Sequence, residues 1–140
     1  MRVKTTKYLA VVIAALSSLA AIPAYAGKTL DSVKARGRVM CGVNVGLPGF
    51  SAADSNGNWS GLDVETCRAI AAATLGDADK VRYVPLNPQQ RFTALQSGEI
   101  DVLARNTTFT LTRDASLGLM QTVATYYDGQ GFLVPVKSKL

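Results

Sequence analysis

Histidine is absent from this chain of 140 residues, which excludes several common reaction centres at once. A Ser-His-Asp triad, a Cys-His pair and a histidine-based zinc site all need an imidazole. We therefore expect no metal site, no cofactor and no enzyme activity of these kinds.

Long apolar runs are also scarce, and the one that occurs lies near the N-terminus, from about Leu9 to Ile22. Arg2, Lys4 and Lys7 precede it, and Ala24-Tyr25-Ala26 follows it. This order is typical of a secretory signal peptide cut after a small residue, here after Ala26. The alternative is a retained membrane anchor, but the run is shorter than the ~20 residues that span a bilayer. We predict a signal peptide over 1–26, a domain over 27–140 and export to the periplasm.

Excess positive charge is small once the leader is set aside. Three of the fifteen Lys and Arg residues lie in the leader, so the remainder carries twelve against ten Asp and Glu, a net charge of about +2. No block rich in Lys and Arg with interleaved aromatic residues follows. These two observations argue against a nucleic-acid partner.

Cysteine is limited to two residues, Cys41 and Cys67. In a chain exported to an oxidising compartment, a disulfide between them is the favoured interpretation. The alternative is a pair of small buried thiols.

The rest of the chain alternates between helical and strand patterns. Helices are predicted over 30–37, 63–76 and 88–98, the last capped by Asn87, and a helical turn near Thr112. Strands are predicted over 38–45, 81–86, 100–105 and 131–136, with a hairpin signal at Asn56-Gly57. This order indicates an α/β domain with a mainly parallel sheet. Ligands bind beyond the carboxyl ends of such strands, where Asn44 and Asn106 fall.

The segment NTTFTLTR, residues 106–113, follows an apolar strand and is dense in hydrogen-bonding groups. Arg113 falls in the first turn of a helix that Thr112 would cap, and Arg91 falls near the start of the helix capped by Asn87. A cation is disfavoured there, because free N–H groups already give a helix start positive character. Two such arginines are explained if an anion lies between them. Arg113 could hold a carboxylate in a two-pronged fork, aided by threonine hydroxyls.

Simpler explanations remain open for the same residues. Arg113 could pair with Asp114 or Asp101 on the surface, and Arg91 could be solvated. Asn106-Thr107-Thr108 and Asn58-Trp59-Ser60 also fit the N-glycosylation pattern, which arises often by chance. Asp63 and Glu65 are two residues apart on a helix and share no face, so we interpret them as charges that favour the helix start.

The combination of motifs resembles a known family. The run GNWSGLDVETCRAIAAA resembles the signature of the extracellular solute-binding proteins (family 3) that serve polar-amino-acid ABC transporters. RFTALQSGEIDVLARNTTFTLTRD continues the likeness. CGVNVGLPGF, LGDADKV and YYDGQGFLV resemble the general L-amino-acid-binding branch, near the glutamate and aspartate binders. The likeness runs from about Thr29 to Val136. It implies the first lobe of a type II periplasmic binding protein.

The resemblance also implies a ligand site. Arg113 matches the arginine that clamps the α-carboxylate of an amino acid, and Thr108 matches the hydroxyl residue beside it. Asn106 matches a position whose backbone carbonyl accepts from the α-ammonium group. Arg91 falls where binders of acidic amino acids keep an arginine for the side-chain carboxylate.

Three further positions imply a pocket wall, with two departures from the family pattern. Asn44 and Leu47 match the loop after the first strand, with Phe50 behind it. Many relatives place an aromatic residue at the position of Leu47, and acidic-specific relatives place an arginine at that of Asn44. Both changes imply a roomier and less selective pocket.

The expected function is therefore the amino-acid-binding component of an ABC importer, with a membrane permease as its partner and a broad range of L-amino acids, acidic ones included, as ligands. The chain ends near the first crossing to the second lobe, so we expect a truncated first lobe without the second. A truncated remnant without transport activity is one alternative. A periplasmic dehydratase on the same fold is another, although such enzymes need an acid from the second lobe.

Overall fold

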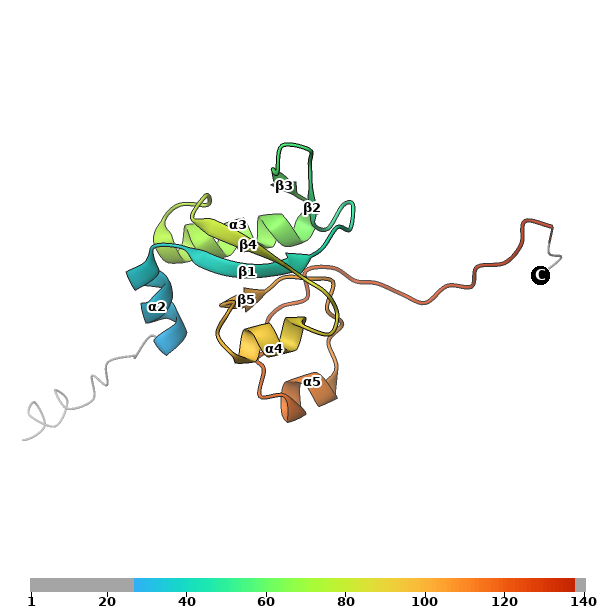
Figure 1. Ribbon diagram of the computed structural model, residues 1–140. Helices are drawn as coiled ribbons and strands as arrows, with labels where there is room; N and C mark the ends of the chain where they lie inside the picture. Colours follow the sequence, from blue (N-terminus) through green and yellow to red (C-terminus); the bar gives the residue numbers. More distant parts are fainter. Residues whose placement is uncertain (1–26, 138–140) are drawn as a thin grey trace, which may run out of the picture.

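A computed structural model describes residues 27–137, so the predicted signal peptide lies outside the described residues. Figure 1 shows a twisted sheet with helices on both faces. The sheet contains β1 (Val39–Asn44), β4 (Val81–Leu86) and β5 (Val102–Leu103) in the order β4-β1-β5, and both pairings are parallel. The α/β prediction with a mainly parallel sheet is confirmed.

The central strand β1 is buried on both faces, as expected for a strand with a parallel neighbour on each side. On one face, Val39, Cys41 and Val43 pack with Cys67 and Ala71 of α3 (Leu62–Leu75). Val33 of α2 (Lys28–Arg36) joins this cluster. A disulfide joins Cys41 to Cys67 with their Cα atoms 6.1 Å apart, which fastens α3 to the middle of the sheet.

The opposite face of β1 has a second, smaller core. Leu86, Ala94 and Ile100 are buried together beneath α4 (Arg91–Gln96). Gly42 of β1 faces this cluster, and a Cβ atom there would lie 2.6 Å from Ile100 Cδ1 and 2.9 Å from Leu86 Cδ1. The lack of a side chain at Gly42 therefore lets the second core pack directly on the strand.

The predicted hairpin forms between β2 (Ala52–Ala53) and β3 (Trp59–Ser60), which pair antiparallel. Gly61 follows it with φ of 119° and ψ of 173°, a conformation that essentially only glycine adopts. A Cβ atom at Gly61 would lie 2.4 Å from the carbonyl oxygen of Phe50. This close approach lets the N–H of Leu62 donate to Gly49 O (3.0 Å) and that of Asp63 donate to Phe50 O (2.9 Å). The start of α3 is thereby fixed against the loop after β1.

Two predicted helix starts need correction. The helix α4 begins at Arg91, because Asn87 Oδ1 accepts from the N–H groups of Gln89 and Gln90 and holds residues 87–90 in a separate turn. The cap of α5 (Leu111–Ser116) is Thr110 and not Thr112, since Thr110 Oγ1 accepts from the N–H of Arg113 at 3.3 Å. Both arginines nevertheless lie in the first turn of their helices.

The prediction of a strand over 131–136 is wrong. Residues 117–137 contain no helix or strand, and Figure 1 shows the chain leaving the body of the domain as an extended trace. Phe132, Leu133 and Val136 are fully exposed. The apolar sequence favours a strand, but the segment has no neighbouring strand within residues 27–137 to complete its hydrogen bonds. No helix in this range is long and apolar enough to cross a membrane.

We predict that Gly61→Ala lowers the free energy of unfolding by at least about 3 kcal/mol, because it combines a strained φ with a clash against backbone. Gly57→Ala is the matched control: its φ is 83°, but no atom lies within 4 Å of the added Cβ. The control should therefore show the backbone strain alone. Urea unfolding of both variants measures the difference, and equal losses would contradict the close approach at Gly61.

We also predict that Cys41 and Cys67 are bonded in exported protein. Closing the loop between them should stabilise the fold by about 3 kcal/mol in the chain-entropy model. Mass spectrometry of a non-reduced digest should find the linked peptide, and urea unfolding with and without reductant should show the loss. Complete alkylation of both thiols before reduction would support the alternative of two buried thiols.

Candidate functional site

The carboxyl ends of β1 and β5 are joined by two amide side chains. Asn44 ends β1 and is buried, and its Nδ2 donates to Asn106 Oδ1 at 3.0 Å. Its Oδ1 accepts from the N–H of Gly46 at 3.3 Å, and its own N–H donates to Ser51 Oγ at 3.0 Å. Parallel pairing places these strand ends at one edge, so residues 62 apart in sequence meet there. The side chain of Asn44 is thus already engaged with protein.

The loop after β1 forms a compact turn at this edge. The N–H of Leu47 donates to Ser51 O at 2.7 Å, and the N–H of Phe50 donates to Leu47 O at 3.0 Å. Leu47 and Phe50 are both half-buried. The Phe50 ring packs edge-on against Tyr126, with centroids 5.1 Å apart, so the outgoing C-terminal segment touches this loop.

Arg113 and Arg91 lie around one aromatic ring. The guanidinium carbon of Arg91 is 4.7 Å from the centroid of Phe92, and that of Arg113 is 5.4 Å from it. Arg113 Nη1 donates to the carbonyl of Thr108 at 2.6 Å, which leaves most of its N–H groups open. The structure therefore brings Arg113, Thr108 and Arg91 together, as the sequence predicts.

Arg91 has one longer hydrogen bond and one buried N–H group without a partner among the described residues. Its Nη1 donates to Thr107 Oγ1 at 3.3 Å, and its Nε is buried without a hydrogen-bond partner among the described residues. The pKa of Arg91 is lowered by burial, and further by the charges of Arg105 and Arg113. The negative charge of a carboxylate beside Arg91 would offset both the loss of hydration and the repulsion from the other arginines.

Two buried charges at this edge escaped the sequence analysis. Arg105 is buried, and its Nε donates to Leu86 O at 3.0 Å, across to the end of β4. Asp63 is also buried, and its Oδ2 accepts from the N–H of Asn106 at 3.2 Å. Asp63 lies in the first turn of α3, as the sequence predicts, and the loop after β5 also contacts it. Asp63 lies within the family-like run GNWSGLDVETCRAIAAA, but that run does not reveal its hydrogen bond to Asn106.

Burial shifts the pKa of each of these two groups in the direction that favours its neutral form. Burial raises the pKa of Asp63, and the N–H of Asn106 and the charge of Arg105 oppose the shift. Burial lowers the pKa of Arg105, and Asp63 opposes that shift. The attraction between Asp63 and Arg105 therefore compensates only part of the cost of burying their charges.

The edge has an excess of positive charge. Arg91 lies near the charges of Arg105 and Arg113, and Asp63 lies near Arg105. Within residues 27–137, neither Arg91 nor Arg113 has an ion-pair partner, and Asp101 pairs with Arg36 instead. The predicted alternative of an Arg113 pair with Asp114 or Asp101 is therefore absent from the described residues. The arrangement suits a carboxylate.

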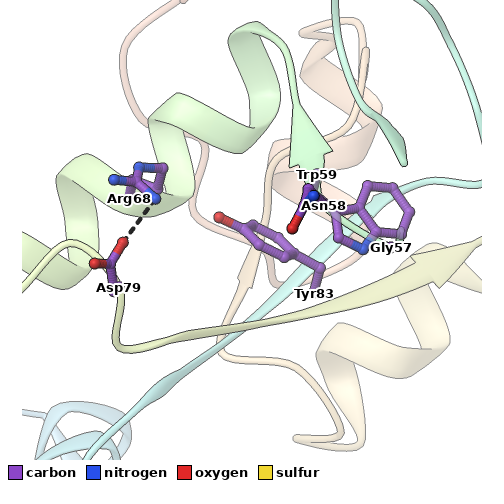
Figure 2. A pocket seen from close by; sticks show the side chains of 6 residues that line it. All are labelled: Gly57, Asn58, Trp59, Arg68, Asp79 and Tyr83. Atoms are coloured by element: carbon purple, nitrogen blue, oxygen red, sulfur yellow. Dashed lines mark hydrogen bonds and ion pairs between the residues drawn. The ribbon is translucent and has the colours of Figure 1, made fainter. Parts of the chain in front are cut away.

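Two hollows of the described surface lie away from this edge. One of about 320 Å³ lies between the hairpin, α3 and β4, and Figure 2 shows Trp59 and Tyr83 on one side of it. There Arg68 is neutralised by Asp79 at 2.8 Å and by Glu65 at 3.5 Å. The other, of about 310 Å³, lies beside Arg36 and Asp101. Neither is lined by a predicted ligand residue. No group of three metal-ligating side chains occurs in residues 27–137.

Comparison with known proteins gives consistent matches. The chain is 55% identical over 128 residues to the general L-amino acid-binding periplasmic protein AapJ of Rhizobium johnstonii, covering 91% of this chain and 38% of AapJ. A periplasmic binding protein of an ABC transporter from Brucella ovis, solved with glutathione bound, is 60% identical with a TM-score of 0.63. That match covers 64% of this chain and 28% of the solved one.

A third match is to a single domain. The arginine-bound form of domain 1 from TmArgBP is 31% identical with a TM-score of 0.53, and the match covers 60% of this chain and 64% of that one. The chain spans about 40% of the length of the curated relatives that it matches. These neighbours have the type II periplasmic binding protein fold, and the described residues match part of its first lobe.

Residues 39–140 match the model of one family, and the arrangement of strand ends and arginines described above falls within that range. The chain belongs to the bacterial extracellular solute-binding proteins, family 3.

Proposed function

We propose that this chain is the amino-acid-binding part of a solute receptor for an ABC importer, and that Arg113 holds the α-carboxylate of the ligand. The observation that carries the proposal is that Arg91 and Arg113 both lie by the Phe92 ring and have no ion-pair partner among residues 27–137. The coarser function is that of its relatives, which include an amino-acid-binding periplasmic protein. The assignment of individual residues is our own.

Two neighbours of Arg113 complete the proposed contacts. The Thr108 side chain is exposed beside the guanidinium that its carbonyl holds, so its hydroxyl and N–H can reach the same carboxylate. The backbone carbonyl of Asn106 is proposed to accept from the α-ammonium group. Asn106 is itself exposed, while its side chain is fixed by Asn44.

The ligand range is proposed to be broad, with acidic amino acids included. Arg91 offers a partly desolvated charge to a second carboxylate. Leu47 and Phe50 provide apolar wall without a stacking ring at Leu47, and Asn44 carries no charge. A wall of this kind discriminates weakly between side chains. AapJ, which is named for general L-amino acids, supports the same range.

Binding fits the site better than catalysis. The edge has one carboxylate, Asp63, and it is buried and already accepts from Asn106. A general acid or base must reach the proton that it transfers. We therefore propose no enzyme activity, and we propose that a membrane permease of an ABC transporter is the partner.

One lobe should bind its ligand weakly. Charged contacts on an open surface are screened by water, and no opposing surface in residues 27–137 excludes solvent from Arg113. Domain 1 of TmArgBP with arginine bound supports the idea that a single lobe retains part of a site. We expect millimolar affinity for this chain alone, about −4 kcal/mol.

We predict that Arg113→Ala abolishes detectable binding of L-glutamate and L-glutamine, since a charged, two-pronged contact is worth at least about 1.5–3 kcal/mol. Arg113→Lys should also weaken binding, because it keeps the charge and loses the fork. Arg82→Ala is the matched control, as it removes an exposed arginine near the other end of the sheet. Amide shifts in NMR titrations report the affinity. Equal affinity in the Arg113 and Arg82 variants would remove Arg113 from the site.

We predict that the exported protein begins at Gly27, because residues 1–26 are proposed to be a cleaved signal peptide and 27–140 the first lobe. Intact-mass measurement of protein recovered from the periplasm of a bacterial host tests both claims. A mass that includes the first 26 residues, in a membrane fraction, would instead support the retained anchor.

A further inference from the structure

The loop of residues 106–108 is where the proposed ligand groups are held together. Thr107 Oγ1 accepts from Arg91, and the carbonyl of Thr108 accepts from Arg113. The side chain of Asn106 accepts from Asn44. A displacement of this loop would therefore move both arginines relative to the end of β1.

Asp63 is the one carboxylate that contacts this loop within residues 27–137. It lies in the first turn of α3, a helix fixed to β1 by the disulfide and to the loop after β1 by backbone bonds. Its side chain is 5% exposed, so it is covered from a ligand on the open edge. Its hydrogen bond to the N–H of Asn106 links the rigid helix to the loop that bears the ligand groups.

We propose that Asp63 is a positioning residue for amino-acid binding: it acts through the Asn106 N–H on the loop that presents Arg91 and Arg113, and it does not touch the ligand. This inference rests on the proposed function of those arginines. Burying a carboxylate in the fold is unfavourable unless it is paired and hydrogen-bonded, and the bonds to Asn106 and the charge of Arg105 provide that compensation.

Positioning and simple electrostatics predict opposite results. Asp63 places a negative charge beside Arg105, whose own charge acts on Arg91, so it weakens the attraction of this edge for an anion. If charge alone mattered, Asp63→Asn and Asp63→Ala would both tighten the binding of L-glutamate. If the hydrogen bond positions the loop, both variants bind less well, and Asp63→Asn binds better than Asp63→Ala because its amide oxygen can still accept from Asn106.

The test compares these variants with Glu65→Gln. Glu65 is the other acid in the first turn of α3, and its side chain is 68% exposed. We expect Asp63→Ala to lower the affinity for L-glutamate and L-glutamine by at least about tenfold, Asp63→Asn to fall between it and the wild type, and Glu65→Gln to be unchanged. Tighter glutamate binding in either Asp63 variant would overturn the proposal. So would an equal effect of Glu65→Gln.

A second measurement needs no ligand, so it separates this proposal from the proposed function. Hydrogen exchange of the Asn106 amide, read by NMR, should accelerate at least about tenfold in Asp63→Ala and less in Asp63→Asn, while amides in β1 stay protected. If the wild type binds no amino acid, the proposed function fails, and the exchange result still decides whether Asp63 holds the loop. Unchanged exchange at Asn106 would overturn the positioning role, and retained protection in β1 shows that the variants are folded.

Discussion

Parallel pairing of β1 with a strand on each side is the constraint on which the site depends. Because β4, β1 and β5 run in the same direction, their carboxyl ends meet at one edge. Asn44, Arg105 and Asn106 arrive there from distant parts of the sequence. The core on either face of β1 fixes this arrangement, through α3 and the disulfide on one face and through the close packing on Gly42 on the other. The hydrogen bonds at the edge then adjust a geometry that the sheet has already set.

The electrostatics of that edge are unfavourable in the unliganded lobe. Arg91 and Arg105 are partly desolvated, and both have lowered pKa values because burial disfavours their charge. A fold that needed only stability would place apolar side chains or a full set of ion pairs there. Here, among the described residues, the guanidinium groups of Arg91 and Arg113 have no ion-pair partner and are held by threonine oxygens and the Phe92 ring. Such an arrangement is expected where an anion binds between the cations.

The sequence predicts the architecture well and the edge contacts only in part. Hydrophobic periodicity places α3 and β4 within a residue of their observed bounds. The predicted start of α4 is three residues too early. Asn87 Oδ1 accepts from the N–H groups of Gln89 and Gln90 in a turn, and an asparagine that caps a helix makes the same kind of bond, so the sequence does not distinguish the two. The strand over 131–136 fails for a different reason. Strand formation requires a partner, and apolar composition cannot show whether one is present.

Among the site residues, the difference is one of local against long-range information. Arg113 could be recognised because its place at a helix start is unusual in its own segment. The role of Asp63 could not, because an acid in a first helical turn is unremarkable until the loop after β5 covers it. Under the proposed function, the same contact would help one lobe to hold its half of the site in place. The lobe fixes the direction of its guanidinium groups through backbone and buried charge, while the strength of the attraction depends on how far water is excluded from the opposite side. Under the proposed function, the residues described here supply the geometry, and excluding water from the opposite side would supply most of the affinity.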